Sequence, residues 1–291
     1  MLRLLPLLLL AVVLMGCRSA RRVKPASSSK AGEVLVVGDE SGLLSASLSR
    51  SVPGLPQEEP LFDVRRITAE QLSGNALLAR AIVVVGRGGY KVGRDLDARP
   101  QLVVRAQLSD SVRVLRDLLA FEESVALAQL RRHPNAEMEA RVRRQFGVDM
   151  TIPEEMKASK TGRDFLWMAT NGAENVRGLC VMRLRNADGE RLAVAVDSAL
   201  AHNIRGERAS VRMHLLLPAV EKTVDEGRTV LRGQWEMDGD AMGGAFVASA
   251  GHTSGETIVL LAFAYAPERK KRNIMRQLQA VVLNDNITYG Q

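Results

Sequence analysis

Residues 228–265, RTVLRGQWEMDGDAMGGAFVASAGHTSGETIVLLAFAY, decide the fold class of this chain. Three apolar runs, at about 228–237, 243–250 and 256–265, are separated by short segments rich in glycine and aspartate. None of these separating segments is long enough to hold a helix. Because strands that are joined by such short turns pair antiparallel, the stretch predicts an antiparallel sheet.

The rest of the chain extends this prediction to an α+β fold. Further strands are predicted at about 33–38, 61–67, 81–86, 101–107 and 219–224, and in the segments VDMTIP, DFLWMAT and RGLCVMRL. Helices are predicted over SGLLSASLSR, from the cap region at 109–111, from Asn135 to Gly147, over about 190–203, and after Pro267, where an apolar stripe is formed by Ile274, Met275, Leu278, Val281 and Val282. Strands follow one another more often than they alternate with helices, which predicts mainly antiparallel sheets with packed helices.

The N-terminus, MLRLLPLLLLAVVLMGC, reads as a secretory signal. A single Arg3 precedes an apolar stretch that is shorter than the roughly 20 residues of a membrane-spanning helix. Leu14 to Cys17 resemble the bacterial lipobox, in which a lipid is attached to the cysteine thiol and the chain is cut before it. The resemblance implies a signal peptide at 1–16 and an acylated Cys17, and the alternatives are an ordinary cleaved signal and an uncleaved anchor.

The remaining chain divides into a tether and two halves. Residues 17–31 hold almost no large apolar side chain and predict a flexible tether. Two α+β halves of usual domain size follow, at 32–147 and 148–291. Three prolines at 53, 56 and 60 exclude a helix or a central strand, so composition alone indicates a linker there.

Charge and cysteine content exclude some classes of function. The net charge is +7, and the basic segment RSARRVK after Cys17 either attracts anionic lipid headgroups or simply solvates the tether. Aromatic residues make up 4% of the chain, which leaves few platforms for stacking bases, and an exported protein is not expected to bind nucleic acid. If Cys17 carries lipid, Cys180 is the remaining thiol, and its apolar surroundings predict a core position.

No catalytic or metal motif is found. The four histidines, at 133, 202, 214 and 252, lie far apart without metal-ligand spacing, and no G-x-S-x-G segment is present. The glycine-rich VVVGRGGYKVG at 83–93 lacks the lysine and hydroxyl of a phosphate loop, so we interpret it as a turn between strands. The sequence therefore predicts no metal and no cofactor, and it favours a non-catalytic protein over the alternative, a periplasmic hydrolase.

The strongest candidate site is QWEMDGDAMGGAF, which combines apolar side chains, carboxylates and glycines. Its structural interpretation is a hairpin turn at Asp238 and Gly239, with Gly243 and Gly244 as a bulge or a tight contact between strands. Its functional interpretation is a groove for a peptide or lipid, with Trp235 as the apolar anchor. The candidate residues are Trp235, Asp238, Asp240, Met242, Gly243 and Gly244.

Several motifs resemble those of one family in order. They are GEVLVVGDE, VPGLPQEEPLFDV, ARPQLVV, QFGVDMTIPEEM, DFLWM, RGQWEMDGDAMGGAFV and FAYAPERKKRNIMRQLQAV, from about residue 32 to 283. The chain is therefore similar to an uncharacterised Bacteroidota lipoprotein family, domain of unknown function 4837, although Ala241 and Ala245 depart from its pattern. The resemblance implies a single folded unit with the proline segment as a packed connector, and it implies no activity.

Together these observations predict a lipid-anchored protein of the cell envelope. The expected location is the outer membrane. RSARRVK lacks the acidic patch that is associated with surface export in Bacteroidota, the group that the resemblance implies, and this favours the periplasmic face. The predicted partners are the lipid bilayer, through Cys17, and an envelope protein, peptide or lipid that the protein binds or helps to assemble.

Overall fold

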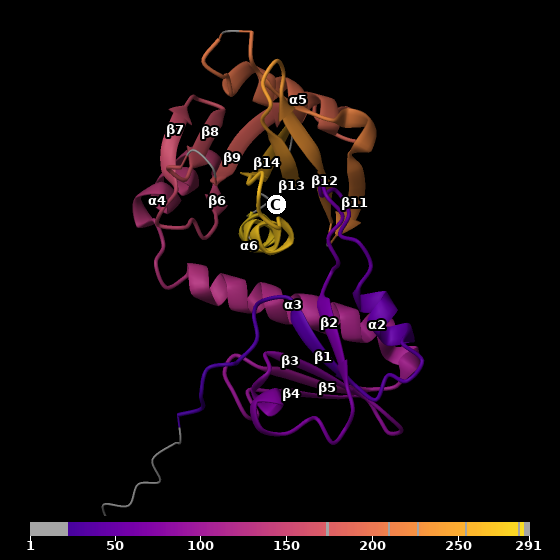
Figure 1. Cartoon of the computed structure of the whole chain (residues 1–291). Helices are drawn as coiled ribbons and strands as arrows, with labels where there is room; N and C mark the ends of the chain where they lie inside the picture. The colour runs from indigo at the N-terminus through magenta and orange to yellow at the C-terminus, as the bar shows by residue number, and fades with distance from the viewer. Residues whose placement is uncertain are drawn as a thin grey trace, which may run out of the picture.

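The computed structural model describes residues 23–172, 175–208, 210–225, 227–253, 255–284 and 286–287, and Cys17 and the signal segment lie outside them. The fold is α+β, as predicted, and is built on two main sheets at opposite ends of the molecule (Figure 1). No helix among the described residues is long and apolar enough to cross a membrane.

The larger sheet has eight strands. They are β7 (Lys157–Thr161), β8 (Phe165–Ala169), β9 (Val176–Arg185), β10 (Met213–Leu215), β11 (Glu221–Asp225), β12 (Arg228–Met237), β13 (Gly243–Thr253) and β14 (Glu256–Tyr265). The order is β10-β12-β13-β14-β9-β8-β7, with β11 also paired to β12. Every pair is antiparallel, so the interpretation of residues 228–265 is confirmed.

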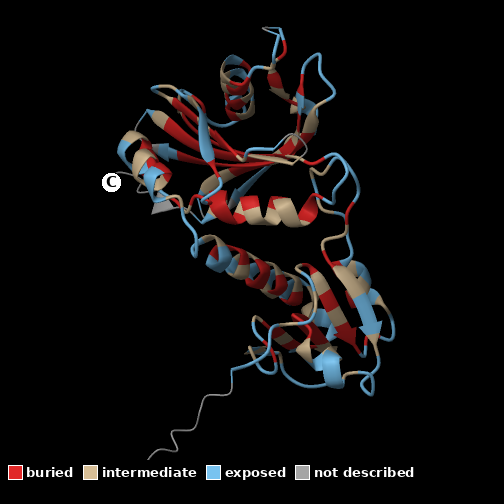
Figure 2. Cartoon of the chain, turned by 60° about the vertical axis from the view of Figure 1, so that its left-hand side comes forward, coloured by how far each residue is buried: buried red, intermediate tan, exposed pale blue. Residues whose placement is uncertain are grey.

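Helices cover both faces of the larger sheet, because its long strands alternate apolar residues toward each face. On one face lie α4 (Ala136–Phe146) and α6 (Arg272–Leu283), whose buried residues share a core with Leu179 and Leu260. On the other face lies α5 (Arg191–Asn203), which packs on Cys180 and Leu261. Figure 2 shows these buried strands between the helices.

Helix α4 has both signals that the sequence predicted. Asn135 caps it by accepting a hydrogen bond from the Met138 amide, and Gly147 ends it at φ 72°. The expected boundary at 147 placed this helix in the N-terminal half, but its buried residues pack in the core of the larger sheet. By packing, the two halves therefore meet between α3 and α4.

The smaller sheet has the order β2-β1-β3-β5-β4. Its strands are β1 (Glu33–Val37), β2 (Asp63–Ile67), β3 (Ala81–Val85), β4 (Lys91–Arg94) and β5 (Leu102–Ala106). All pairs are parallel except β4 with β5, unlike the antiparallel pairing expected for most of the chain. The turn that we predicted at 83–93 does connect β3 to β4.

One face of the smaller sheet is covered by α2 (Leu43–Leu48) and α3 (Ser111–Leu130). Helix α3 also contacts α6 through Ala126, Leu127 and Ala280. The two halves are thus joined helix on helix, with α3 and α6 between the two sheets (Figures 1 and 2). Short elements complete the fold: η1 (Gly74–Leu78), η2 (Leu108–Asp110), η3 (Leu217–Ala219), β6 (Val148–Asp149) and β15 (Asn286–Ile287).

The proline segment is packed, as the family resemblance implied. Phe62 is fully buried and Leu61 is half-buried. Glu59, also buried, accepts hydrogen bonds from the backbone amides of Lys271 and Arg272, at 2.5 and 3.0 Å. Because these amides open α6, a carboxylate from one half of the chain caps a helix of the other.

The expectation of a flexible tether over 17–31 is wrong for the residues nearest the sheet. Ala26 forms a parallel bridge with Arg99, and the Ser28 amide donates to the Leu78 carbonyl at 2.9 Å. The hydroxyl of Ser29 accepts from the Arg80 amide at 2.8 Å. These contacts are mostly to the backbone, which is why composition does not reveal them. We call residues 24–29 the strap.

Candidate functional site

A cavity of about 430 Å³ opens on the face of the larger sheet that carries α5. We call it the aromatic pocket. Its apolar lining comes from the ends of strands and from the segment after α5: Trp167, Val176, Ile204, Val211, Met213, Trp235, Met237, Met242, Phe263 and Tyr265. Arg205, Gly206, Glu207, Arg208 and Asp240 complete it. The volume lies in the range of small-molecule sites.

Trp235 is held by the packing of three neighbouring strands. It lies opposite Gly244 in the β12–β13 register and only 3% of it is exposed. Its ring meets Phe263 edge-on, with centroids 5.1 Å apart. A Cβ on Gly244 would lie 3.1 Å from the indole nitrogen and 2.0 Å from the Ala264 carbonyl oxygen. The glycine is therefore required by close approach of the strands and of the indole.

A second glycine has the same role under the neighbouring ring. Gly178 lies opposite Phe263 in the β14–β9 pair, and a Cβ there would be 2.1 Å from the phenyl ring. The rings of Phe263 and Trp235 can thus lie low on the sheet, which leaves room above them. Two bare backbone positions in adjoining strand pairs help to form the pocket.

Neither tryptophan side chain of the pocket is satisfied as a hydrogen-bond donor. The indole N–H groups of Trp167 and Trp235 are both buried and have no partner among the described residues. Such groups are uncommon in folded proteins and each has a desolvation cost. The lining of the pocket therefore holds two unpaired donors among otherwise apolar side chains.

Charged side chains lie at the rim. Arg205, Glu207, Arg208 and Asp240 are all exposed. Arg208 donates to the Gly239 carbonyl at 3.2 Å, which ties the segment after α5 to the β12–β13 turn. Two positive and two negative charges give the mouth no net preference of sign.

The structure brings three of the six predicted site residues together at the aromatic pocket. Trp235, Asp240 and Met242 line the pocket, whereas Asp238, Gly243 and Gly244 do not. Asp238 is exposed in the turn, and its amide donates to the Arg212 carbonyl at 2.8 Å. Gly243 lies in the strand without positive φ, and a Cβ there would be 2.9 Å from the Trp235 carbonyl oxygen. Both glycines are therefore positions of tight contact, in regular register and without a bulge.

Sequence reasoning missed Trp167 and the segment from Ile204 to Val211. They come from β8 and from the connection between α5 and β10, far from the candidate motif in sequence. One signal was available: the chain has two tryptophans, and both line this pocket.

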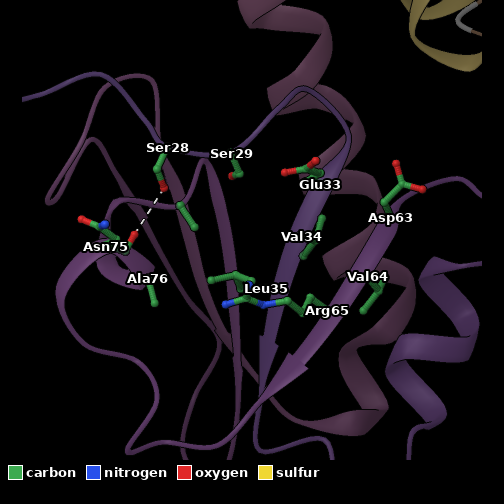
Figure 3. A pocket seen from close by; sticks show the side chains of 11 residues that line it. Ser28, Ser29, Glu33, Val34, Leu35, Asp63, Val64, Arg65, Asn75 and Ala76 are labelled. Atoms are coloured by element: carbon green, nitrogen blue, oxygen red, sulfur yellow. Dashed lines mark hydrogen bonds between the residues drawn. The ribbon is translucent and has the colours of Figure 1, made fainter.

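A second cavity, of about 480 Å³, lies on the smaller sheet (Figure 3). Several of its polar groups already have partners. The Ser28 hydroxyl donates to the Asn75 carbonyl at 3.2 Å, and Asp63 accepts from Arg272 at 2.7 Å. That hydrogen bond holds the pKa of Asp63 below its usual value. Among the described residues that line this cavity there is no histidine to activate a hydroxyl.

The histidines with side-chain partners lie outside the aromatic pocket. His214 lies 3.3 Å from Asp197, between β10 and α5, and His252 lies 3.0 Å from the Thr257 hydroxyl. Thr257 in turn donates to the Ala187 carbonyl at 2.8 Å, so its hydroxyl is engaged. Cys180 is fully buried, as expected, and burial raises the pKa of its thiol.

Comparison with known families assigns both halves to domains without a described activity. The family model "Domain of unknown function (DUF4837)" matches residues 135–284, just over half of the chain. A second model, "Domain of unknown function (DUF8532)", matches residues 27–143. The first match confirms the resemblance for the larger half. All three motifs before residue 135 fall within the second match, so the resemblance to the first family is not confirmed for residues 32–134. No curated protein sequence matches the chain.

Among solved structures, cyanobacterial PsbP (CyanoP) from Synechocystis sp. PCC 6803 is similar at a low level. The TM-score is 0.32 and the identity 11%, over 48% of this chain and 86% of that chain. A likeness of this size carries no argument about function.

Proposed function

The chain belongs to the family Domain of unknown function (DUF4837), whose description names no activity, and we propose from its geometry a lipid-anchored, non-catalytic binding protein of the cell envelope. The binding site is the aromatic pocket, and the ligand is an apolar chain or side chain carried by a lipid or peptide. One observation carries the proposal: the lining includes four aromatic and three methionine side chains, all buried or half-buried, whereas its charged side chains are all exposed.

The lining suits binding better than catalysis. Methionine side chains are flexible and adapt to ligands of irregular shape, while aromatic rings provide large rigid contact areas. General acid–base catalysis would need a titratable group within hydrogen-bond reach of the reacting atoms. Here the acidic and basic groups lie at the mouth, exposed to water, rather than at the base. This favours the binding protein over the alternative, a periplasmic hydrolase.

The two tryptophans supply a direct assay for ligand binding. Since both line the pocket, bromine atoms on a bound fatty acid would quench the fluorescence of the protein. We expect saturable quenching by a fatty acid brominated along its chain, and a hydrophobic peptide that competes for the site should reduce that quenching. Absence of both effects would contradict the proposed site.

A matched pair of variants locates the ligand. Met242→Asp places a charge on the half-buried lining and should weaken binding at least about tenfold, which corresponds to 1.4 kcal/mol. Val224→Asp places the same charge on an exposed position of β11, outside the pocket, and should leave binding unchanged. Equal affinities of the two variants would show that quenching arises elsewhere.

The lipid anchor has its own test, independent of the pocket. Cys17→Ser should abolish incorporation of a clickable fatty acid into the protein in living cells, because it removes the thiol that the lipobox presents. A variant at the buried thiol, Cys180→Ala, is the control and should keep the label. Unchanged labelling of the Cys17 variant would reject acylation at this residue.

A further inference from the structure

One face of the smaller sheet, turned away from α3, has no α-helix over it among the described residues. In register, Leu35, Arg65, Ile82 and Val103 share this face. The connection from β2 to β3, residues 68–80, crosses it and buries Ile82, but leaves Leu35 and Val103 half-exposed. We call this surface, with the loop 95–99 at its border, the tether face.

The strap runs along the border of the tether face. Lys24 donates to the Asp95 carbonyl, Ala26 pairs with Arg99, and Ser28 and Ser29 line the cavity of Figure 3 together with Leu35 and Arg65. Only five residues lie between Cys17 and Val23, the first described residue, so the two are six residue steps apart. Six residues reach about 20 Å at full extension, so a lipid on Cys17 would keep this border within about that distance of the membrane.

The tether face exposes apolar side chains beside the strap. Leu96 is 51% exposed and Leu77 is 36% exposed. Leu96 lies over Gly93, where a Cβ would meet its side chain at 2.8 Å, and Gly93 pairs with Val103 in register. Leu96 is therefore on the same face as Val103. Val23, the residue just before the strap, is 95% exposed.

Basic residues flank this apolar surface. Lys91 and Arg105 lie opposite one another in the β4–β5 pair, on the same face, and both are exposed. At the loop, Lys24 and Arg99 are balanced by Asp95, which is paired with Arg99 at 3.5 Å, and by the exposed Asp97, so the excess positive charge comes from Lys91 and Arg105. The carboxylates of Glu33 and Asp63 lie near the start of β1 and β2 (Figure 3). Asp63 is paired with Lys270 and Arg272.

We propose that the tether face lies against an anionic lipid surface, with Leu77 and Leu96 at the headgroup boundary and Lys24, Lys91 and Arg105 facing the headgroups. The inference rests on the proposed acylation of Cys17. It adds to this anchor a defined orientation of the protein on the membrane. A single acyl attachment is strengthened by apolar and basic contacts beside it, because the two contributions to membrane retention add.

The test uses the full chain, purified from membranes and reconstituted into vesicles of phosphatidylcholine with a minority of phosphatidylglycerol. A fluorophore on Leu96→Cys reports on the tether face, and one on Val194→Cys, an exposed position of α5, is the matched control. Cys180 is buried and is not expected to react. A headgroup-level nitroxide lipid should quench the first label at least about threefold more strongly than the second.

A charge-reversed pair separates docking from anchoring. Lys91→Glu combined with Arg105→Glu should reduce quenching at residue 96 while the protein still floats with the vesicles. Lys157→Glu with Lys222→Glu, two exposed positions of the larger sheet, is the control and should not. If the protein floats with the vesicles but residues 96 and 194 are quenched equally, the proposed docking surface is wrong and the anchor stands. If the unmutated chain does not float, both the anchor and this inference are wrong.

Discussion

At the scale of single residues, glycines set the geometry of the aromatic pocket. Gly178 and Gly244 give no side chain to the sheet where the rings of Phe263 and Trp235 lie. The candidate motif included Gly244, and one structural interpretation of this glycine was a β-bulge. The structure shows a regular pair with the strands too close for a Cβ.

Gly244→Ala tests this packing. The added methyl group would lie 2.0 Å from the Ala264 carbonyl oxygen, so strands β13 and β14 must shift. We expect a loss of about 1 to 3 kcal/mol in the free energy of unfolding, the usual cost of overpacking, measured by urea denaturation. Gly86→Ala is the control, because a Cβ there meets nothing within 4 Å. Equal stability of the two variants would show that β13 and β14 can accommodate a Cβ at residue 244 without cost.

Asp63 gives the protein a specific dependence on pH. Its pKa is lowered in the folded state, chiefly by the hydrogen bond from Arg272. A lowered pKa stabilises the fold above the unfolded value, near 4, and that contribution is lost as pH falls through the folded pKa. Asp63→Asn should therefore lower the melting temperature most near neutral pH, and the difference from the unmodified protein should shrink below about pH 4.

The exposed Asp97→Asn is the control for that series, since Asp97 has no ion-pair partner among the described residues. A gap between the Asp63 variant and the unmodified protein that stays constant from pH 7 to about 3 would contradict the role assigned to the carboxylate.

At the scale of elements, helix α6 is the joint of the molecule. It packs on the larger sheet through Met275 and Leu278, and it meets α3 through Ala280. Its N-terminus has no cap of its own and is completed by Glu59 from the proline segment. The carboxylate that caps α6 thus comes from a residue more than two hundred positions earlier in the sequence.

Glu59→Gln should weaken this joint. The amide side chain keeps an acceptor oxygen but loses the charge and one of the two acceptors for the Lys271 and Arg272 amides. We expect a loss of about 1 to 2 kcal/mol in the free energy of unfolding, as for other helix caps. Glu58→Gln, an exposed neighbour, should have no effect, and a comparable loss there would mean that the charge acts only at long range.

Elements with a strong local signal were predictable, and elements defined by tertiary contacts were not. The cap, stripe and stop of α4 and the apolar stripe of α6 follow from short-range rules. Strands β7 and β10 were missed, because KASKT is polar at a sheet edge and MHL is too short to show a period. The parallel pairing of β1, β3 and β5 depends on how their connections cross the sheet, which residue type does not encode.

At the scale of the whole molecule, the two halves share a core at α3 and α6 and should unfold together. Phe62 is fully buried in the smaller half, with the Arg276 guanidinium 4.4 Å from its ring centroid. Both tryptophans belong to the larger half. Phe62→Ala should cost about 3 to 5 kcal/mol and should shift the tryptophan-detected transition as far as the circular dichroism transition. Val112→Ala, at an exposed position, is the control.

Separate transitions in the Phe62 variant would show that the halves are independent domains, which would favour the linker interpretation of the proline segment. The candidate site shows the same dependence on the whole fold. Trp235 and Met242 could be found from one motif. Trp167 and Ile204 reach the pocket only because β8 belongs to the same sheet and the end of α5 lies over that sheet.

The order of layers, with the smaller sheet, α3, α6 and the larger sheet stacked in succession, sets the distance at which the pocket works. Packed layers are spaced by roughly 10 Å, so about 30 Å separates the tether face from the sheet that holds the pocket. The pocket opens on the far side of that sheet, where α5 lies. A protein standing on its tether face would hold the pocket mouth well clear of its own bilayer. Its ligand would then have to enter the pocket from the aqueous compartment or be transferred by a partner protein. It could not pass directly into the pocket from the membrane on which the protein stands.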